Sequence, residues 1–213
     1  MTQIKICGVT LPDDAARVAA AGVDFIGLNF WTKSKRYLDP VRAPMIAAAA
    51  RASGPAKVVG VFVDTDIDEV SAVTSQVELD IIQLHGDEDP EDVQAIAKAT
   101  KLPVWKSIAM GASKDLDHLE AWPVEHILLD APSAGRGGSG KTFDWTLAIE
   151  AHRRYPARRF FLAGGLDPHN VVAAITAVNP WGVDVATGVE AGPGIKDAMK
   201  IAAFVAAVRG GAA

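Results

Sequence analysis

The sequence predicts a single (β/α)8 barrel domain that spans residues 1–213. Three observations lead to this fold class: about eight short apolar runs rich in β-formers, Ala-rich amphipathic stretches between them, and no linker or change of composition that divides the chain. Strands of a parallel sheet are buried on both faces and therefore appear as short continuous apolar runs. Eight strand–helix units in a row are typical of a barrel, although 213 residues lie toward the short end for that fold.

Each predicted strand is an apolar run of about three to six residues, which suits a buried parallel strand. The runs are Gln3–Ile6, Phe25–Asn29, Lys57–Phe62, Ile81–Leu84, Val104–Ile108, Ile127–Leu129, Phe160–Ala163 and Val183–Val185. The predicted helices are Pro12–Ala21, Val41–Arg51, Ile67–Val77, Pro90–Lys98, Lys114–Glu120, Trp145–Arg154, Pro168–Val178 and Lys196–Arg209. An Asp-Pro pair predicts an N-cap followed by proline at the first helical position, and such pairs occur at Asp39-Pro40, Asp89-Pro90 and Asp167-Pro168.

An open, doubly wound sheet is the main alternative architecture. It usually needs fewer strands, and its dinucleotide-binding form carries a G-x-G-x-x-G fingerprint after the first strand. The corresponding stretch of this chain, KICGVTLPDDAA, lacks that pattern. The barrel is therefore favoured.

The composition argues against several function classes. The formal net charge is −5, whereas a nucleic-acid backbone demands clustered Lys and Arg, so we expect no nucleic-acid partner. No apolar run reaches the roughly 18 to 20 residues of a membrane span, and the N-terminus lacks the layout of a secretory signal. The single cysteine rules out an intrachain disulfide and suits a reducing compartment. We expect a cytoplasmic protein without a membrane partner, and a monomer with a dimer as the alternative.

Small residues after the last two predicted strands form a candidate phosphate site. Active sites of these barrels lie at the C-terminal ends of the strands, where Gly164-Gly165 follows one strand and Thr187-Gly188 follows the next. Short turns there can direct several backbone N–H groups at one phosphate. The alternative is that these glycines only make tight turns. Two such pairs on adjacent strands favour the phosphate site.

A thiol and a carboxyl group also lie at predicted strand ends. Asp130 closes the strand EHILLD, and partial desolvation would raise the pKa of its carboxyl so that it keeps a proton to donate near neutral pH. Cys7 lies at the end of the first strand in KICG, and a thiol with an ordinary pKa of about 8.5 becomes a base or nucleophile when cations such as Lys5 or Arg36 lie nearby. A buried structural cysteine and a turn-capping acid are the alternatives.

Two further features have more than one interpretation. His85 in QLHG is a candidate ligand or a packed ring, but no His-x-x-x-His motif or paired cysteine accompanies it, so no metal is expected. The irregular segment Ala131–Thr142 contains GRGGSGKT, which matches the spacing of a phosphate-binding P-loop. A P-loop needs a helix that begins at its Lys-Thr, whereas Asp144 predicts a later helix start. We therefore favour a lid over the barrel mouth, with a plain surface loop as the alternative.

An ordered set of motifs covers nearly the whole chain. The motifs are KICG, FIGLNF followed by SKRYL, VGVF, QLHG, LLDAPSAGRGGSGKTFDW, LAGGLDPHNV, and VDVATGVE followed by PGIKD. Together they resemble the phosphoribosylanthranilate isomerases of tryptophan biosynthesis. The resemblance implies a (β/α)8 barrel and an Amadori rearrangement of N-(5′-phosphoribosyl)anthranilate to 1-(2-carboxyphenylamino)-1-deoxyribulose 5-phosphate, without metal or cofactor.

The resemblance also implies roles for individual residues. Asp130 aligns with the general acid that protonates the ribose ring oxygen, and Cys7 aligns with the general base that removes the C2′ proton. Arg36 matches the residue that holds the anthranilate carboxylate. The remaining matches are a phosphate cradle and two site-lining residues, namely Gly164, Gly165, Thr187 and Gly188 for the cradle and His85 and Asp184 for the lining.

Two other functions remain open from the sequence. A phosphosugar lyase that forms a Schiff base would need a lysine at a strand end, and Lys106 is the only good candidate. A non-catalytic phosphometabolite-binding barrel would tolerate the loss of Cys7 and Asp130.

Overall fold

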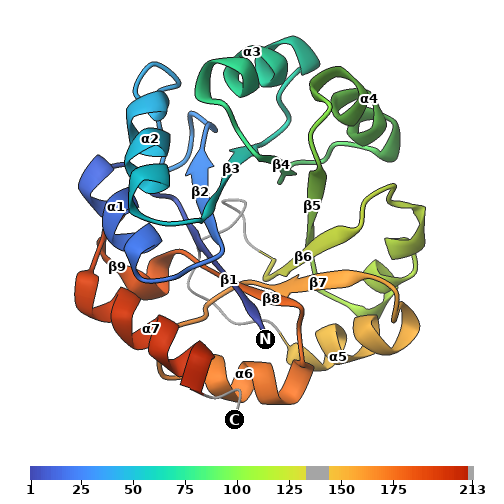
Figure 1. The fold of residues 1–213 in the computed structure, drawn as a ribbon. Coiled ribbons are helices and arrows are strands. Elements are labelled where there is room, and N and C mark those ends of the chain that lie inside the picture. Colours follow the sequence, from blue (N-terminus) through green and yellow to red (C-terminus); the bar gives the residue numbers. More distant parts are fainter. Residues whose placement is uncertain (133–143, 211–213) are drawn as a thin grey trace.

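The computed structural model describes residues 1–132 and 144–210. Within them, eight parallel strands form a closed barrel in chain order, in which β8 pairs with β1 (Figure 1). The strands are β1 (Gln3–Cys7), β2 (Phe25–Asn29), β3 (Lys57–Phe62), β4 (Ile81–Leu84), β5 (Val104–Ala109), β6 (His126–Asp130), β7 (Arg159–Leu162) and β8 (Gly182–Val185). The predicted fold class is confirmed, and every predicted strand end lies within one residue of the observed end. The lid predicted in 131–142 lies outside the described residues from position 133 onward.

A ring of helices surrounds the barrel (Figure 1). The α-helices of the described residues are α1 (Pro12–Ala20), α2 (Ala43–Ser53), α3 (Ile67–Val77), α4 (Pro90–Thr100), α5 (Trp145–Arg154), α6 (Val171–Val178) and α7 (Ala198–Gly210). Their inner faces share one buried hydrophobic cluster with strand residues, as Val18, Ile46 and Phe204 illustrate. No described helix combines the length and the apolar character needed to cross a bilayer.

One of the three predicted Asp-Pro helix starts is confirmed. Asp89 caps α4, because its Oδ1 accepts the N–H groups of Glu91 and Asp92, while Asp92 accepts the N–H of Asp89 in return. The other two predictions are wrong by a few residues. Asp39 and Asp167 instead close turns that precede their helices, and α2 and α6 begin only at Ala43 and Val171.

The connection between β5 and β6 differs from the prediction of an α-helix over Lys114–Glu120. It contains two 3-10 helices, η1 (Ser113–Leu116) and η2 (Leu119–Ala121). The buried apolar residues of the two 3-10 helices are Leu116 in η1 and Leu119 in η2. With so few apolar contacts, a longer α-helix would have little to stabilise it.

The connection between β8 and α7 carries extra structure at the barrel mouth. It begins with the 3-10 helix η3 (Thr187–Val189) and continues into an antiparallel hairpin of β9 (Glu190–Gly192) and β10 (Ile195–Lys196). The helix predicted from Lys196 therefore begins two residues later, at Ala198. The backbone N–H of Lys196 donates to Asp14 Oδ2 of α1, which fixes the hairpin beside the first β/α unit.

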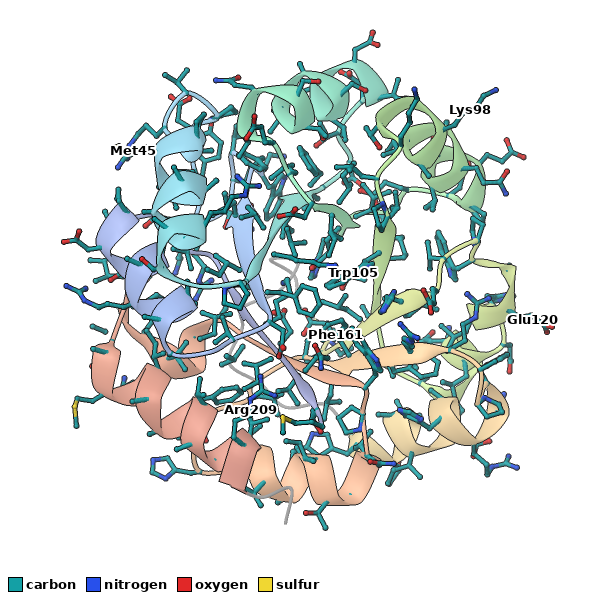
Figure 2. All side chains as sticks on the ribbon, in the orientation of Figure 1. Met45, Lys98, Trp105, Glu120, Phe161 and Arg209 are labelled. Carbon is teal, nitrogen blue, oxygen red and sulfur yellow. The ribbon has the colours of Figure 1, made fainter. Side chains whose placement is uncertain are left out.

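An aromatic cluster fills the barrel interior toward the N-terminal ends of the strands. The rings of Phe25 and Trp105 lie 4.9 Å apart between centroids, those of Trp105 and Phe161 lie 4.8 Å apart, and Figure 2 shows Trp105 and Phe161 in the middle of the barrel. Because side chains alternate along a strand, Gly27 shares the inward face of β2 with Phe25. The apolar cluster thus occupies one end of the barrel, and polar side chains gather at the other.

Candidate active site

The predicted site residues all lie at the C-terminal ends of barrel strands or in the loops that follow. Cys7 and Asp130 are the last residues of β1 and β6, and Asp184 lies near the end of β8. Parallel strands place all their C-terminal ends on one face of a barrel, so residues distant in the sequence meet there. The other predicted residues follow β2, β4, β7 and β8, and they are Arg36, His85, Gly164, Gly165, Thr187 and Gly188.

Cys7 is partly exposed, and its sulfur faces β2. The neighbouring residue there is Gly27, and a Cβ added to Gly27 would lie only 2.8 Å from Cys7 Sγ. Lys5 precedes Cys7 by two residues, so it lies on the same face of β1, and it is fully buried. Its Nζ lies 2.9 Å from Oδ1 of Asp184, which is its partner in the β1–β8 register. The predicted site residue Asp184 is therefore ion-paired beside the thiol.

The surroundings of Cys7 act on its protonation in opposite directions. Burial raises the pKa of the Cys7 thiol above its ordinary value; the charge of Lys5 opposes this rise, Asp184 adds to it, and Lys196 opposes it. Burial also lowers the pKa of Lys5, but Asp184 and Cys7 more than compensate, so the Lys5 pKa is raised overall. Lys5 is therefore a buried cation that stabilises a thiolate once one forms.

Asp130 has a buried carboxyl group whose two oxygens face different partners. The backbone N–H of Ala131 donates to Oδ1 at 2.7 Å, and His85 Nε2 lies 3.3 Å from Oδ2. Oδ1 is therefore held by the backbone, and Oδ2 is the oxygen that lies beside His85. Gly164 makes room for this arrangement, since a Cβ at that position would lie 3.0 Å from Asp130 Oδ1.

His85 connects Asp130 to two polar residues of neighbouring strands. Its Nδ1 lies 3.0 Å from Gln83 Nε2, and its Nε2 lies 3.3 Å from Ser107 Oγ as well as near Asp130. The ring is therefore held by hydrogen bonds at both nitrogens. In the described ranges, His, Cys, Asp and Glu side chains form no group of three or more that could hold a metal ion.

The loops after β7 and β8 lie in contact with each other. Gly164 and Gly165 have φ angles of 81° and 65°, a region that favours glycine. A Cβ at Gly188 would lie 2.1 Å from the carbonyl oxygen of Leu166, so only glycine permits this approach of the two loops. Among the described residues, no hydrogen bond uses the N–H of Gly164 or Gly165. These two donors are available to an anionic ligand.

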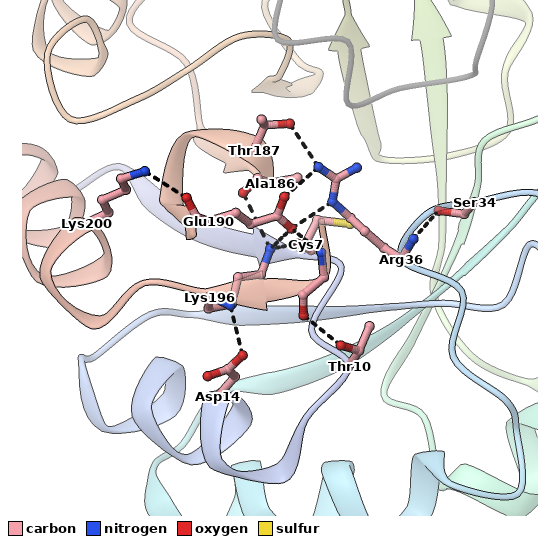
Figure 3. Close-up of polar contacts among 11 residues, drawn as sticks. Cys7, Thr10, Asp14, Ser34, Arg36, Ala186, Thr187, Glu190, Lys196 and Lys200 are labelled. Atoms are coloured by element: carbon pink, nitrogen blue, oxygen red, sulfur yellow. Dashed lines mark hydrogen bonds and ion pairs between the residues drawn. The ribbon is translucent and has the colours of Figure 1, made fainter. Parts of the chain in front are cut away.

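Arg36 reaches across the barrel mouth from the loop after β2 to the loop after β8. Its Nε and Nη2 donate to Glu190 Oε1 and Oε2 at 2.8 and 2.7 Å, and Nη2 also donates to Thr187 Oγ1 at 3.0 Å (Figure 3). Gly8 allows this path, because it has a φ of 73° and a Cβ there would lie 2.2 Å from Arg36 Cδ. Gly8 of the KICG motif therefore leaves the space that the side chain of Arg36, in the SKRYL motif, occupies.

A cavity of about 700 Å³ opens beside Asp130 and includes Lys106, the lysine of the Schiff-base alternative. Lys106 Nζ donates to Gly86 O at 2.7 Å, to Glu88 Oε2 at 3.0 Å and to Ser107 O at 3.1 Å. All three ammonium hydrogens are engaged, and a Schiff-base lysine needs a free neutral amine. These contacts argue against a lysine nucleophile.

Sequence reasoning missed several partners of the predicted residues. Glu190 accepts a hydrogen bond from Arg36, and Lys196 donates one to the carbonyl oxygen of Cys7. The ring of His85 is hydrogen-bonded to Gln83 and Ser107. The available signal was the position of Glu190 and Lys196 within the motifs VDVATGVE and PGIKD. Nothing in the sequence shows that Glu190 pairs with a residue 154 positions away.

A family model for N-(5'phosphoribosyl)anthranilate (PRA) isomerase matches residues 4–207. The chain belongs to this family. The N-(5'-phosphoribosyl)anthranilate isomerase of Ralstonia nicotianae is 42% identical over 218 residues, which cover 98% of this chain and 93% of the relative. The isomerase of Caulobacter sp. strain K31 is 41% identical over 215 residues, which cover 98% of this chain and 99% of the relative.

Solved structures of the isomerase family have the same fold. The phosphoribosylanthranilate isomerase of Thermotoga maritima superposes with a TM-score of 0.87 at 39% identity, covering 99% of this chain and 100% of that one. A second isomerase structure, in complex with reduced 1-(o-carboxyphenylamino)-1-deoxyribulose 5-phosphate, gives a TM-score of 0.84 at 36% identity and covers 99% of this chain and 100% of that one. The isomerase activity predicted from the motifs, a step of tryptophan biosynthesis, is confirmed by this membership.

Proposed function

We propose that the chain isomerises N-(5′-phosphoribosyl)anthranilate by general acid–base catalysis, with Asp130 as the acid and Cys7 as the base. Asp130 gives a proton to the ribose ring oxygen while the C1′–O bond breaks, and the anilino nitrogen supplies the electron pair that forms a protonated Schiff base. The Cys7 thiolate then takes the proton from C2′, which leaves an enolamine. Tautomerisation of the enolamine yields the ketone, so one acid and one base suffice.

The observation that carries this proposal is the placement of a buried acid and a cation-flanked thiol on the same barrel face. Asp130 Oδ1 accepts the backbone N–H of Ala131, so we propose that the proton is donated from Oδ2, the oxygen that lies beside His85. The positive charges of Lys5 and Lys196 both favour the thiolate form of Cys7. An acid and a base that work in one turnover need such different surroundings, because before the reaction the acid must carry its proton and the base must lack one.

The proposed substrate contacts follow from the two unused loop donors and from Arg36. We place the phosphate at the loops after β7 and β8, where the N–H groups of Gly164 and Gly165 are unpaired among the described residues and where Thr187 and Gly188 lie opposite. Arg36 Nη1, which donates to no described residue, is the nitrogen proposed to hold the anthranilate carboxylate. One isomerase structure is in complex with a reduced carboxyphenylamino deoxyribulose phosphate, which carries a carboxylate and a phosphate. This ligand supports separate contact sites for the two anionic groups.

Loss of phosphoribosylanthranilate fluorescence on addition of the purified protein tests the function. We expect first-order decay that is proportional to enzyme concentration and needs no added metal or cofactor. Decay no faster than in buffer would contradict the activity. Chelation with EDTA beforehand is the control for the absence of a metal requirement.

Arg36→Ala is expected to weaken substrate binding more than turnover. A charged hydrogen bond of this kind contributes roughly 1.5–3 kcal/mol, so KM should rise by about tenfold or more while kcat changes much less. Steady-state kinetics by the fluorescence assay give both constants. An unchanged KM would contradict the carboxylate role.

Alkylation of Cys7 should have an unusually alkaline pH dependence. Only the thiolate reacts with iodoacetamide, and burial raises the thiol pKa, so the midpoint of the rate profile should lie above the ordinary value of about 8.5. Because the sequence contains one cysteine, every alkylation event reports this residue. The urea-denatured chain is the control and should show the ordinary midpoint. A native midpoint at or below that of the denatured chain would be inconsistent with the burial effect.

The remaining proposals concern the setting of the enzyme. We propose that residues 1–213 act as one catalytic domain in the cytoplasm, with a small-molecule phosphosugar as the partner and no nucleic acid or membrane. A monomer stays the expectation, although one Thermotoga maritima isomerase is described as dimeric, with monomers generated from it. Sedimentation of the purified chain distinguishes the two states.

A further inference from the structure

A buried carboxylate at the barrel mouth binds two cations at once. Glu190 Oε1 accepts hydrogen bonds from Arg36 Nε and Lys196 Nζ, both at 2.8 Å, and from the N–H of Gly194 at 3.2 Å. Its Oε2 accepts from Arg36 Nη2 at 2.7 Å. The Glu190 side chain is 3% exposed, and Figure 3 shows it between the two cationic side chains. Four hydrogen bonds therefore converge on one carboxylate inside the site.

The charges of this cluster do not cancel. Burial favours protonation of Glu190, but the hydrogen bonds from Arg36 and the charge of Lys196 outweigh it and hold the pKa of the carboxyl below its ordinary value. Glu190 also raises the pKa of Arg36. One carboxylate and two protonated side chains leave one net positive charge next to the end of β1. This net positive charge stabilises the thiolate form of Cys7 and favours the binding of an anionic substrate.

Lys196 connects this cluster to the end of β1. Its Nζ donates to the carbonyl oxygen of Cys7 at 2.6 Å and to that of Ala186 at 3.4 Å, in addition to Glu190. Burial lowers the pKa of Lys196, and Glu190 is the main group that opposes this effect. Removal of the Glu190 charge would leave a buried ammonium without its carboxylate.

We propose that Glu190 is a positioning residue of the isomerase reaction. It holds the guanidinium of Arg36 by its Nε and Nη2 edge, so that Nη1 is directed at the substrate carboxylate, and it keeps Lys196 charged next to Cys7. This inference rests on the carboxylate-binding role proposed for Arg36. Glu190 itself touches neither reacting carbon of the substrate and acts through the two cations.

A double-mutant cycle tests the coupling between Glu190 and Arg36. Glu190→Gln keeps the size of the side chain but removes the charge, and we expect KM for phosphoribosylanthranilate to rise about tenfold. If Glu190 acts through Arg36, then the double variant with Arg36→Ala and Glu190→Gln should have a KM within about threefold of that of Arg36→Ala alone. An additive double variant, or an unchanged KM in Glu190→Gln, would overturn the inference.

The controls separate positioning from folding and from the proposed function. Glu150→Gln removes a carboxylate that also accepts from two cations, Arg153 and Arg154, but lies on the outer helix α5, and its KM should stay at the wild-type value. If Glu190→Gln does not fold by circular dichroism, then Glu190→Asp, which keeps the charge and is one methylene shorter, replaces it in the same cycle. An unchanged KM in Arg36→Ala would overturn the carboxylate role and this inference together. A raised KM in Arg36→Ala with an unchanged KM in the Glu190 variant would overturn this inference alone.

Discussion

Cys7→Ser should lower kcat by about a thousandfold or more while KM stays within a few-fold of the wild-type value. A serine hydroxyl is much less acidic than a thiol, so it does not supply the base that the C2′ proton requires. The substitution fits the space beside Gly27, because oxygen is smaller than sulfur. Substrate binding should survive, since the proposed phosphate and carboxylate contacts come from other residues. Steady-state kinetics by fluorescence loss measure both constants.

A matched control for Cys7→Ser is the thermal stability of the two proteins. Similar melting temperatures would show that the loss of turnover is chemical and not structural. Turnover near the wild-type rate would remove Cys7 from the mechanism. A kcat that is unchanged with a raised KM would assign the thiol to binding instead.

Asp130→Asn should lower kcat by about 10²- to 10⁴-fold, again with KM nearly unchanged. Asparagine has the same shape, and its side-chain oxygen can still accept the N–H of Ala131 as Oδ1 does. The amide has no acidic proton to give to the ribose ring oxygen, so ring opening should become slow. The fluorescence assay again reports the rate.

The control for this substitution is Asp24→Asn at the opposite end of the barrel. Asp24 Oδ2 accepts the N–H of Ile4 at 2.7 Å and pairs with Arg209, so its loss tests for general damage to the fold. We expect the kcat of Asp24→Asn to stay within about twofold of the wild-type value, since it lies outside the site. Equal losses in the Asp24 and Asp130 variants would count against a specific acid role for Asp130.

The strands could be predicted from the sequence because their signal is local. A strand buried on both faces must be apolar at nearly every position, and the runs Lys57–Phe62 and Ile81–Leu84 are too short for the usual helix. The helix boundaries were less accurate for a physical reason. An Asp-Pro pair closes a turn as readily as it caps a helix. Asp167 accepts the N–H groups of His169 and Asn170 just as Asp89 accepts those of Glu91 and Asp92, yet only the backbone after Asp89 continues directly as an α-helix.

The site could be predicted only in part. Strand ends identify Cys7 and Asp130, because in a barrel the position along the strand determines the face. The partners of these residues depend on contacts between distant segments, and the sequence order does not give them. The pair Lys5–Asp184 spans 179 positions, and Glu190 meets Arg36 across 154. The resemblance supplied the candidate acid and base, and the three-dimensional structure supplied the residues that contact them.

The position of the Cys7 sulfur depends on two strands, because Gly27 of β2 lies opposite it. A Cβ at position 27 would occupy space within 2.8 Å of Cys7 Sγ, so any larger residue there must displace the sulfur. The two positions are therefore expected to change together during evolution, with a gain of bulk at one requiring a loss at the other. The same constraint applies to design: a cysteine transplanted onto the first strand of another barrel needs a companion glycine on the second.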